Sequence, residues 1–267
     1  MENCVIVPVD DSHRSLDALI AGQALAGQLG LRLHLVSVVA RQDEVGARRN
    51  AICDAIEELD ADITVLADAA PAEALLRVLG EGSGNVCCMA THARGAISEM
   101  ALGSVARQIV QRHDGPVVLV GPRHARKWRG PIGSVLVCVD GSPLSEQALA
   151  PAAGFAARLK ATLQLTQVLE PEAARMSDNG DTGEWVYLRR LHDQLRHEQG
   201  IGAEWEVLHG NDPADAITSY ADAQPGALIV LTSHGRSGLN RLVMGSVAQS
   251  IVRASASPVW IVRPQSA

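Results

Sequence analysis

"GSVARQIVQRHDGPVVLV" (residues 103–120) and its near copy "GSVAQSIVRASASPVWIV" (residues 245–262) decide the fold of this chain. The two stretches share nine identities in eighteen ungapped positions. Each opens with a Gly-Ser pair, continues with apolar residues at helical spacing and ends in a short β-branched run. The same helix–strand unit therefore occurs twice, and the sequence predicts a duplicated domain.

A second pair of matching stretches shows that the duplication extends over the whole chain. "CVIVPVDDS" (4–12) parallels "SVLVCVDGS" (134–142), 130 residues later, whereas Gly103 and Gly245 are 142 residues apart. The second copy therefore carries about twelve extra residues, and we place them in the polar, glycine-containing stretch within 170–200.

The joint between the copies lies in "GPRHARKWRGPIG" (121–133), which is basic and rich in Gly and Pro. It has no hydrophobic periodicity, which is typical of a linker. We therefore predict a first domain at 1–122, a linker at 123–132 and a second domain at 133–267.

Each half contains five short β-rich apolar runs, separated by helical patterns. The runs lie at 5–9, 31–39, 63–67, 85–90 and 115–120, and then at 134–139, 162–169, 203–208, 227–233 and 257–262. In one of the helical patterns, Val247, Ala248, Ile251 and Val252 fall on a single face. Strands that are buried on both faces and alternate with helices predict an α/β fold with a doubly wound parallel sheet in each half.

Composition limits the classes of function. Hydrophobic residues make up 47% of the chain and aromatic residues only 3%, so we expect an aliphatic core. The net charge of −7 disfavours nucleic acid as a partner, because neutralising phosphates requires a basic face. The beginning "MENCVIVPVD" lacks the pattern of a signal peptide, and no apolar run is long enough to span a membrane. We therefore expect a cytoplasmic protein with no membrane partner.

The five cysteines do not form a recognisable pattern. Their odd number and scattered spacing argue against a disulfide framework or a zinc site. Cys4, Cys87, Cys88 and Cys138 lie in apolar runs, where we expect them to be buried as small hydrophobic side chains.

Candidate functional residues follow the strands. Asp10 and Asp140 come directly after the first strand of each half, and ligands of parallel sheets bind at the carboxyl ends of strands. The Gly-Ser pair at 245–246 opens a helix, whose first N–H groups lack internal partners and attract an anion. Together these groups suit a nucleotide, with Asp140 near ribose hydroxyls or a magnesium ion bridging to the phosphates. The alternative is structural, because glycines are common at such turns and an aspartate often caps the next helix.

"LTSHGRSGLNRLVMGSV" (231–247), with "VCVDGSPLSEQAL" (137–149) upstream, resembles the nucleotide-binding subgroup of the universal stress protein family. That subgroup carries G-x-x-G, nine residues and then G-S/T, and both halves of this chain keep the spacing. The resemblance implies a tandem form with a five-stranded, mainly parallel sheet in each half. The two sheets would pair through their last strands as a pseudo-dimer, and two chains would pair again as a homodimer. It also implies ATP as the ligand.

The resemblance also implies two sets of nucleotide-binding residues. In the second half they are Cys138, Val139, Asp140, Val168, Leu231, Thr232, Gly235, Arg236, Gly245, Ser246, Val247 and Ala248. In the first half they are Pro8, Val9, Asp10, Val38, Met89, Ala90, Ala93, Arg94, Gly103, Ser104 and Val105.

The two halves depart from the family pattern to different degrees. Thr232 and Ala90 both replace the first motif glycine. Ala93 replaces the second one, at a cost if that position needs a positive φ, and Asp11 adds a carboxylate that repels phosphates. The sequence therefore favours the second half as the nucleotide site.

The resemblance implies a nucleotide-dependent stress or regulatory protein. A slow ATP hydrolase is one alternative, although the chain lacks a P-loop and shows no nucleophile–base set, so we predict no catalytic residues. The other alternative is a scaffold with vestigial nucleotide sites that acts through protein partners, whose identity the sequence does not reveal.

Overall fold

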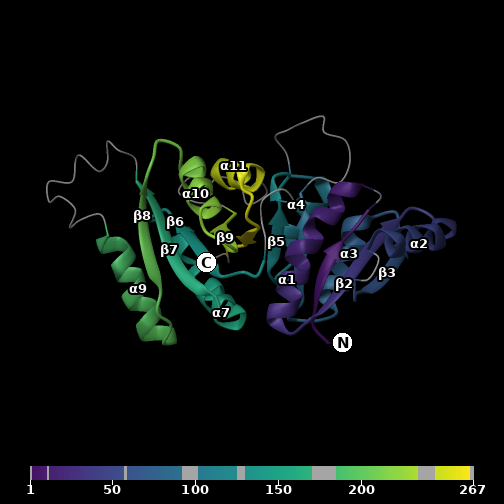
Figure 1. Cartoon of the computed structure of the whole chain (residues 1–267), viewed down its shortest axis with the longest axis horizontal. Helices are drawn as coiled ribbons and strands as arrows, with labels where there is room; N and C mark the ends of the chain where they lie inside the picture. Colours follow the sequence, from purple (N-terminus) through teal and green to yellow (C-terminus); the bar gives the residue numbers. More distant parts are fainter. Residues whose placement is uncertain are drawn as a thin grey trace.

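A single sheet of ten strands runs along the long axis of the molecule (Figure 1). The computed structural model describes residues 2–10, 12–56, 59–91, 102–124, 130–169, 185–233 and 244–264. The strands are β1 (Cys4–Pro8), β2 (Arg32–Val39), β3 (Asp62–Ala67), β4 (Val86–Ala90), β5 (Val117–Val120), β6 (Ser134–Val139), β7 (Thr162–Leu169), β8 (Glu204–His209), β9 (Ala227–Thr232) and β10 (Val259–Val262). Their order in the sheet is β3-β2-β1-β4-β5-β10-β9-β6-β7-β8.

All strand pairs within a half are parallel, and the one pair between the halves is antiparallel. At that junction β5 meets β10, with Val118 opposite Trp260 and Leu119 opposite Val259. The expected pair of five-stranded sheets, joined through their last strands as a pseudo-dimer, is confirmed. Because the junction is antiparallel, the carboxyl ends of the strands in the two halves lie at opposite edges of the sheet.

Helices cover both faces of the sheet. They are α1 (Leu19–Leu29), α2 (Val45–Ile56), α3 (Pro71–Gly80), α4 (Ser104–Arg112), α6 (Pro143–Glu146), α7 (Leu149–Leu159), α9 (Val186–Gln199), α10 (Pro213–Asp222) and α11 (Ser246–Ala254), with the 3-10 helices η1 (His13–Ala18) and η2 (Gln42–Glu44). Buried residues of α1, α2, α7 and α9 form one core layer, and those of α3, α4, α10 and α11 form the other. None of the helices in the described part of the chain combines the length and hydropathy that a membrane crossing requires.

The core consists mainly of aliphatic side chains, as the composition predicts. Val5 and Val7 of β1 belong to one layer, while Ile6 between them belongs to the other, so a strand buried on both faces serves both. Cys87, Cys88 and Cys138 are buried as expected, whereas Cys4 is only half-buried.

One apolar residue of the helical pattern at the start of α11 is exposed. Ala248, Ile251 and Val252 are buried under α11, but Val247 is 40% exposed. Val247 belongs to the first turn of α11, directly after the helix start at Ser246.

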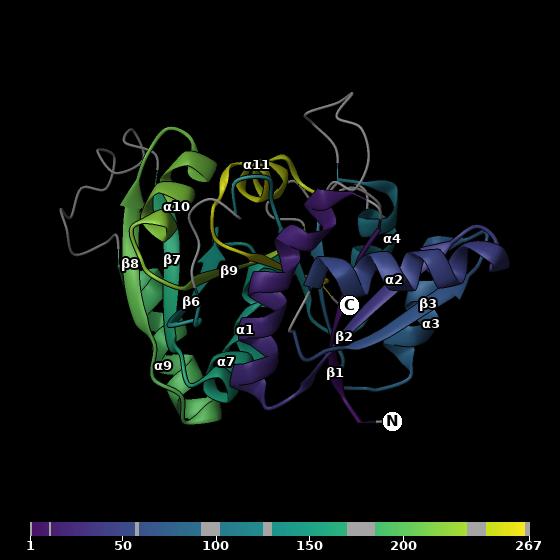
Figure 2. The same cartoon turned by 45° about the vertical axis from the view of Figure 1, so that its right-hand side comes forward.

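Close contacts between the halves reinforce the strand junction. The side chain of Gln28 in α1 accepts from the backbone N–H of Ile132 (2.7 Å) and donates to the carbonyls of Ile132 (2.9 Å) and Leu159 (3.1 Å). Figure 2 shows α1 beside α7, the helix that ends at Leu159. Gly121 packs so closely on α11 that a Cβ at this position would lie 2.0 Å from the carbonyl oxygen of Val252.

We expect Gly121→Ala to lower the free energy of unfolding by about 1–3 kcal/mol, because the added methyl group overpacks the junction. Gly154→Ala in α7 is the matched control, since a Cβ there meets nothing within 4 Å. Removing a mid-helix glycine should leave stability unchanged or raise it by about 1 kcal/mol. Urea denaturation of the three proteins measures both effects, and equal destabilisation by the two substitutions would contradict the packing argument.

Two histidines of the first half are partly withdrawn from water. His34 of β2 places its Nε2 atom 2.8 Å from Thr64 Oγ1 of β3. Burial lowers the pKa of His34, with nearby Asp62 and Glu81 opposing the shift, and burial likewise lowers the pKa of His113. The neutral ring is therefore favoured in the folded state.

Stability should fall at mildly acidic pH. The unfolded chain takes up protons on these rings below pH about 6.5, whereas the folded chain does so only at lower pH, so acid favours unfolding. The stability that the two neutral histidine rings contribute is fully present above pH about 6.5. It is lost as the pH falls from that value through their lower pKa values in the folded state. His34→Gln, which keeps a partner for Thr64, should reduce the loss of unfolding free energy between pH 7.5 and 5.5 in urea titrations. An unchanged loss would show that His34 is not responsible.

Candidate functional site

A cleft of about 1480 Å³ opens at the carboxyl ends of β1, β2 and β4 in the first half. Nine of the residues predicted for this half line it: Pro8, Val9, Asp10, Val38, Met89, Ala90, Gly103, Ser104 and Val105. The other two, Ala93 and Arg94, lie outside the described residues, as does Asp11. Residues from four separate segments of the sequence thus meet at one concave site, at the edge where parallel sheets bind ligands.

The start of α4 forms one wall of this cleft. Gly103 is the residue before the helix, its N–H donates to the carbonyl of Thr91 (3.0 Å), and its carbonyl accepts from Arg107 (2.9 Å). A Cβ on Gly103 would lie 3.0 Å from the same Thr91 carbonyl oxygen, so the turn has no room for a side chain without movement. No side chain in the described part of the chain caps α4, and its first N–H groups suit an anion.

The start of α11 repeats this arrangement in the second half. The N–H of Gly245 donates to the carbonyl of Ser233 (2.8 Å), and its carbonyl accepts from Gln249 (3.0 Å). No described side chain caps α11 either. A Cβ on Gly245 would lie 3.5 Å from the Ser233 oxygen, an ordinary contact, so this turn tolerates a side chain better than the turn at Gly103.

The two aspartates after the first strands hold the following turn together. Asp10 Oδ1 accepts from the backbone N–H (2.9 Å) and hydroxyl (2.6 Å) of Ser12. Asp140 Oδ1 accepts from the same groups of Ser142, at 3.0 Å and 2.6 Å. Each aspartate therefore has a structural role, because it orients the serine that caps the next helix. Asp10 also lines the cleft, and this structural role is compatible with contact to a ligand.

Helix α2 covers the first cleft, a feature that the sequence reasoning missed. It presents Ala47, Arg48, Ala51, Ile52 and Ala55 to the cleft, along one helical stripe. Ile52 is the one fully buried residue among the described residues of α2. The available signal was the spacing of Ala47, Ala51 and Ala55, which places three small side chains on one face of the helix.

Acidic side chains form the rim of the first cleft. Asp43, Glu44 and Asp68 line it in addition to Asp10. Arg41 pairs with Asp43, and Arg77 pairs with Asp68. These arginines offset part of the negative charge that would repel phosphates.

The predicted residues of the second half gather at the carboxyl ends of β6, β7 and β9 and at the start of α11. Those in the described part of the chain are Cys138, Val139, Asp140, Val168, Leu231, Thr232, Gly245, Ser246, Val247 and Ala248. Gly235 and Arg236 lie outside it. Cys138, Leu231 and Ala248 are buried in the core, so their side chains are packing residues. The exposure of Val247 leaves its side chain available beside the helix start.

A polar contact joins two helices in the second half. Glu146 of α6 accepts from the hydroxyl of Tyr187 (3.2 Å) and from Arg190 (2.6 Å) of α9, and we call these three residues the Glu146 clasp. Burial, together with the charge of Glu146, raises the pKa of Tyr187 to about 12. The equivalent residue of the first half, 130 positions earlier, is Leu16, which lines the open cleft. The sequence alignment of the halves already contained this Leu-to-Glu difference.

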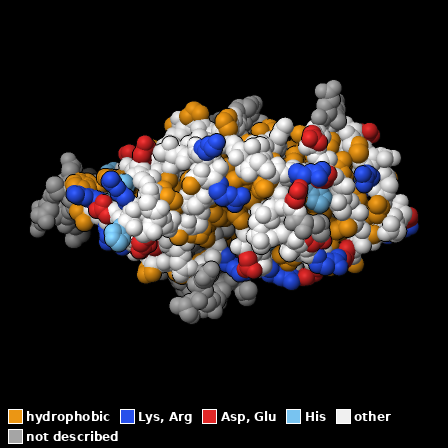
Figure 3. Space-filling model, turned by 90° about the horizontal axis from the view of Figure 1, so that it is seen from below, with side chains coloured by type: hydrophobic (Ala, Val, Ile, Leu, Met, Phe, Trp, Pro, Cys, Tyr) orange, Lys and Arg blue, Asp and Glu red, His pale blue; other side chains and the backbone are white. Residues whose placement is uncertain are grey.

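Metal binding, reactive cysteines and a basic surface patch find little support among the described residues. Among the described residues, no group of three or more His, Cys, Asp or Glu side chains is placed to hold a metal ion. Burial raises the pKa values of the Cys87 and Cys138 thiols to about 12, which keeps them protonated and unreactive. On the face seen from below, Lys and Arg side chains are interspersed with Asp and Glu rather than gathered in one patch (Figure 3).

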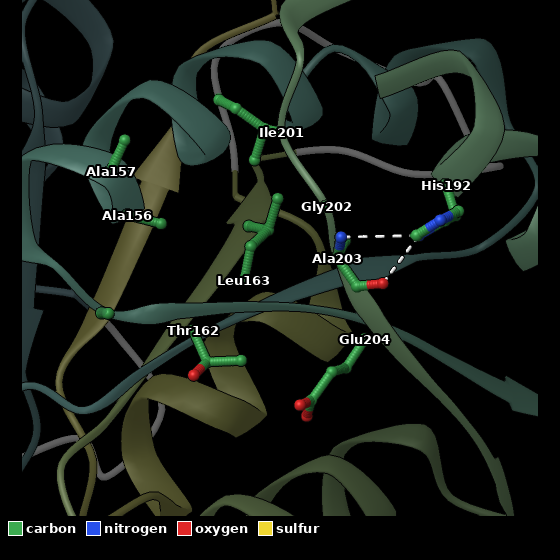
Figure 4. Close-up of a pocket in the computed structure, with 10 residues that line it drawn as sticks. Ala156, Ala157, Thr162, Leu163, His192, Ile201, Gly202, Ala203 and Glu204 are labelled. Carbon is green, nitrogen blue, oxygen red and sulfur yellow. Dashed lines mark hydrogen bonds between the residues drawn. The ribbon is translucent and has the colours of Figure 1, made fainter. Parts of the chain in front are cut away.

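A smaller cavity of about 370 Å³ lies at the amino ends of β7 and β8 (Figure 4). Ala156, Leu163 and Ile201 contribute an apolar lining. Its histidine, His192, is engaged by the fold, because Nδ1 lies 2.7 Å from the carbonyl oxygen of Ala203. This cavity is at the opposite end of β7 from the predicted site residues, so it is separate from them.

Sequence comparison identifies relatives of this chain. The pattern that defines the universal stress protein family matches residues 131–263. A universal stress protein of Mycolicibacterium smegmatis is 28% identical over 179 residues, which cover 64% of this chain and 59% of that protein. The chain thus spans well under two thirds of the length of that relative. Universal stress protein YxiE of Bacillus subtilis is 30% identical over 146 residues, 48% of this chain and 97% of YxiE.

Solved structures agree with this assignment at the level of the fold. A universal stress protein from Archaeoglobus fulgidus superposes with a TM-score of 0.65 at 17% identity, covering 98% of this chain and 99% of that one. A putative universal stress protein from Pseudomonas aeruginosa gives a TM-score of 0.63 at 20% identity, with 98% and 94% covered. The duplicated sheet, the paired last strands and the sequence matches together place this chain in the universal stress protein family, in a tandem two-domain form.

Proposed function

We propose that this protein binds ATP at the carboxyl ends of its strands and acts as a nucleotide-dependent stress or regulatory protein. The observation that carries the proposal is the first cleft. Every described residue that the sequence predicted for the first half lines this one cavity, although the residues come from distant segments.

The groups in the cleft divide into an apolar part and a polar part. Val38, Met89 and the alanines of α2 offer the apolar surface that an adenine ring requires. The turn at Gly103 and Ser104 presents backbone N–H groups and a hydroxyl, which suit the phosphates. Asp10 also lines the cleft, in keeping with a role toward a ribose hydroxyl or a magnesium ion that arrives with the nucleotide.

In the second half, Asp140, Gly245 and Ser246 correspond to Asp10, Gly103 and Ser104 and take the same proposed roles. The Glu146 clasp adds a constraint there, because it joins α9 to the turn after Asp140. We propose that both halves bind nucleotide, that access is freer in the first half, and that two chains form a homodimer.

Replacement of the turn glycines tests the assignment. Gly103→Val should abolish binding in the first half and Gly245→Val in the second, because a branched side chain occupies the space in front of the helix start. Each single variant should bind one ATP fewer than the wild type in a calorimetric titration with magnesium, and the double variant none. A loss of at least about 1.4 kcal/mol, or tenfold in Kd, is expected at each blocked site.

Gly80→Ala is the matched control for these variants, since it lies at the end of a helix where a Cβ meets nothing within 4 Å. It should leave the stoichiometry unchanged. No binding by the wild type up to millimolar ATP would refute the proposal and favour a scaffold with vestigial sites. Undiminished binding in the double variant would place the nucleotide elsewhere.

The Glu146 clasp leads to a kinetic prediction. In the Gly103→Val background, Glu146→Gln should speed association of a fluorescent ATP analogue with the second half by about three- to tenfold, because a weakened clasp lets α9 move away. Asp193→Asn is the control, as Asp193 pairs with Arg189 on the same helix but does not reach α6. Stopped-flow rates measure the effect, and equal rates for the three proteins would mean that the clasp does not control access.

A further inference from the structure

Helices α4 and α11 each begin at one nucleotide site and end against the other half. They lie on either side of the β5–β10 junction (Figures 1 and 2). Each runs from the carboxyl edge of its own half back toward the amino edge. Because the junction is antiparallel, that amino edge is the edge where the opposite half has its own site.

The first connection runs from the first cleft to the end of α11. The N–H of Gly103 donates to the Thr91 carbonyl, and the N–H of Thr91 donates to the Val120 carbonyl, both at 3.0 Å. The chain that follows Val120 then contacts the other half. Gly121 packs on the carbonyl of Val252, Arg123 donates to the carbonyl of Ala254 (2.9 Å), and the His124 ring bonds to the carbonyl of Ala256 (2.9 Å).

The second connection is the counterpart in the opposite direction. The N–H of Gly245 donates to the Ser233 carbonyl (2.8 Å), and the N–H of Ser233 donates to the Val262 carbonyl (3.0 Å). The next residue, Arg263, donates to the carbonyl of Gln111 (2.8 Å) and pairs with Asp114. Gln111 lies in the last turn of α4, the helix that starts at Gly103.

These two connections together link the starts of both helices to the opposite half. The first connection is buried, because His124 has no exposed surface and a Cβ on Gly121 would lie 2.0 Å from the Val252 oxygen. The second connection is a charged contact, in which the Arg263 guanidinium approaches the carboxyl end of α4, which carries partial negative charge. A shift of either helix along its axis therefore changes contacts at both sites.

We propose that each half positions the phosphate-binding helix of the other, so that the two nucleotide sites are coupled. Arg263 of the second half is a positioning residue for the first site, and Gly121 of the first half, together with His124 of the linker, positions the second site. The coupling of affinities rests on the proposed ATP binding, whereas the mechanical linkage between the halves does not.

Hydrogen exchange of the protein without nucleotide tests the linkage. Arg263→Gln should speed amide exchange in residues 102–112 by at least about twofold, because α4 loses a contact at its last turn. Arg32→Gln is the matched control, since Arg32 forms a comparably exposed pair with Asp62, away from α4. Unchanged exchange in 102–112 in the Arg263→Gln protein would overturn the proposal.

Affinity measurements on single-site proteins test the coupling. In the Gly245→Val background, which leaves only the first site, Arg263→Gln should weaken ATP binding by about three- to tenfold. In the Gly103→Val background, Gly121→Ala should weaken the second site by a similar factor, while Gly154→Ala should not. Arg32→Gln should leave the first site unchanged.

The outcomes separate the two proposals. If the wild type binds ATP but Arg263→Gln and Gly121→Ala have no effect on the opposite site, the coupling is refuted and the proposed function stands. If the wild type binds no ATP, the proposed function fails, and the exchange experiment alone decides whether the halves position each other's helices.

Discussion

The antiparallel pair of β5 and β10 is the constraint on which the rest of the structure depends. Val118 and Trp260 lie opposite each other in strands that are buried along their whole length. A last strand left without a partner would expose a row of N–H and C=O groups and an apolar surface. Pairing β5 with β10 removes both of these free edges and joins two sheets into one, and it places the carboxyl ends of the strands of the two halves on opposite sides.

The two joined halves differ in how one of their helices is packed. The first cleft is covered by α2, which buries Ile52, whereas α9 in the second half is anchored by Leu188, Leu191 and Leu195. The Glu146 clasp adds a polar restraint to α9. The duplicated units therefore share the arrangement of the helix start and the aspartate turn, but α2 and α9 differ in how many side chains they bury.

The sequence pointed to the polar residues that line the first cleft but not to the helix that covers it. Residues such as Asp10, Gly103 and Ser104 were found because strand ends and helix starts have local signatures, namely a buried run followed by a capping residue or a glycine. Arg48 and Ala51 of α2 were missed, because which face of a loosely packed helix lines a cavity depends on how far the helix stands from the sheet. The sequence favoured the second half as the nucleotide site because that half keeps more of the motif glycines. The structure adds a different observation, which is a wide cleft in the first half.

By itself, the sequence determined the duplication, the α/β architecture and the places where strands end and helices begin, because these follow from periodicity and from residues that act on their own backbone. Only the tertiary structure decided that Gly121 packs on the carbonyl of Val252, that Arg263 caps the helix beginning at Ser104, and that Val247 is exposed. These contacts join residues more than a hundred positions apart or depend on the cover of a neighbouring helix. They arise from packing between elements, and no pattern within either element encodes them.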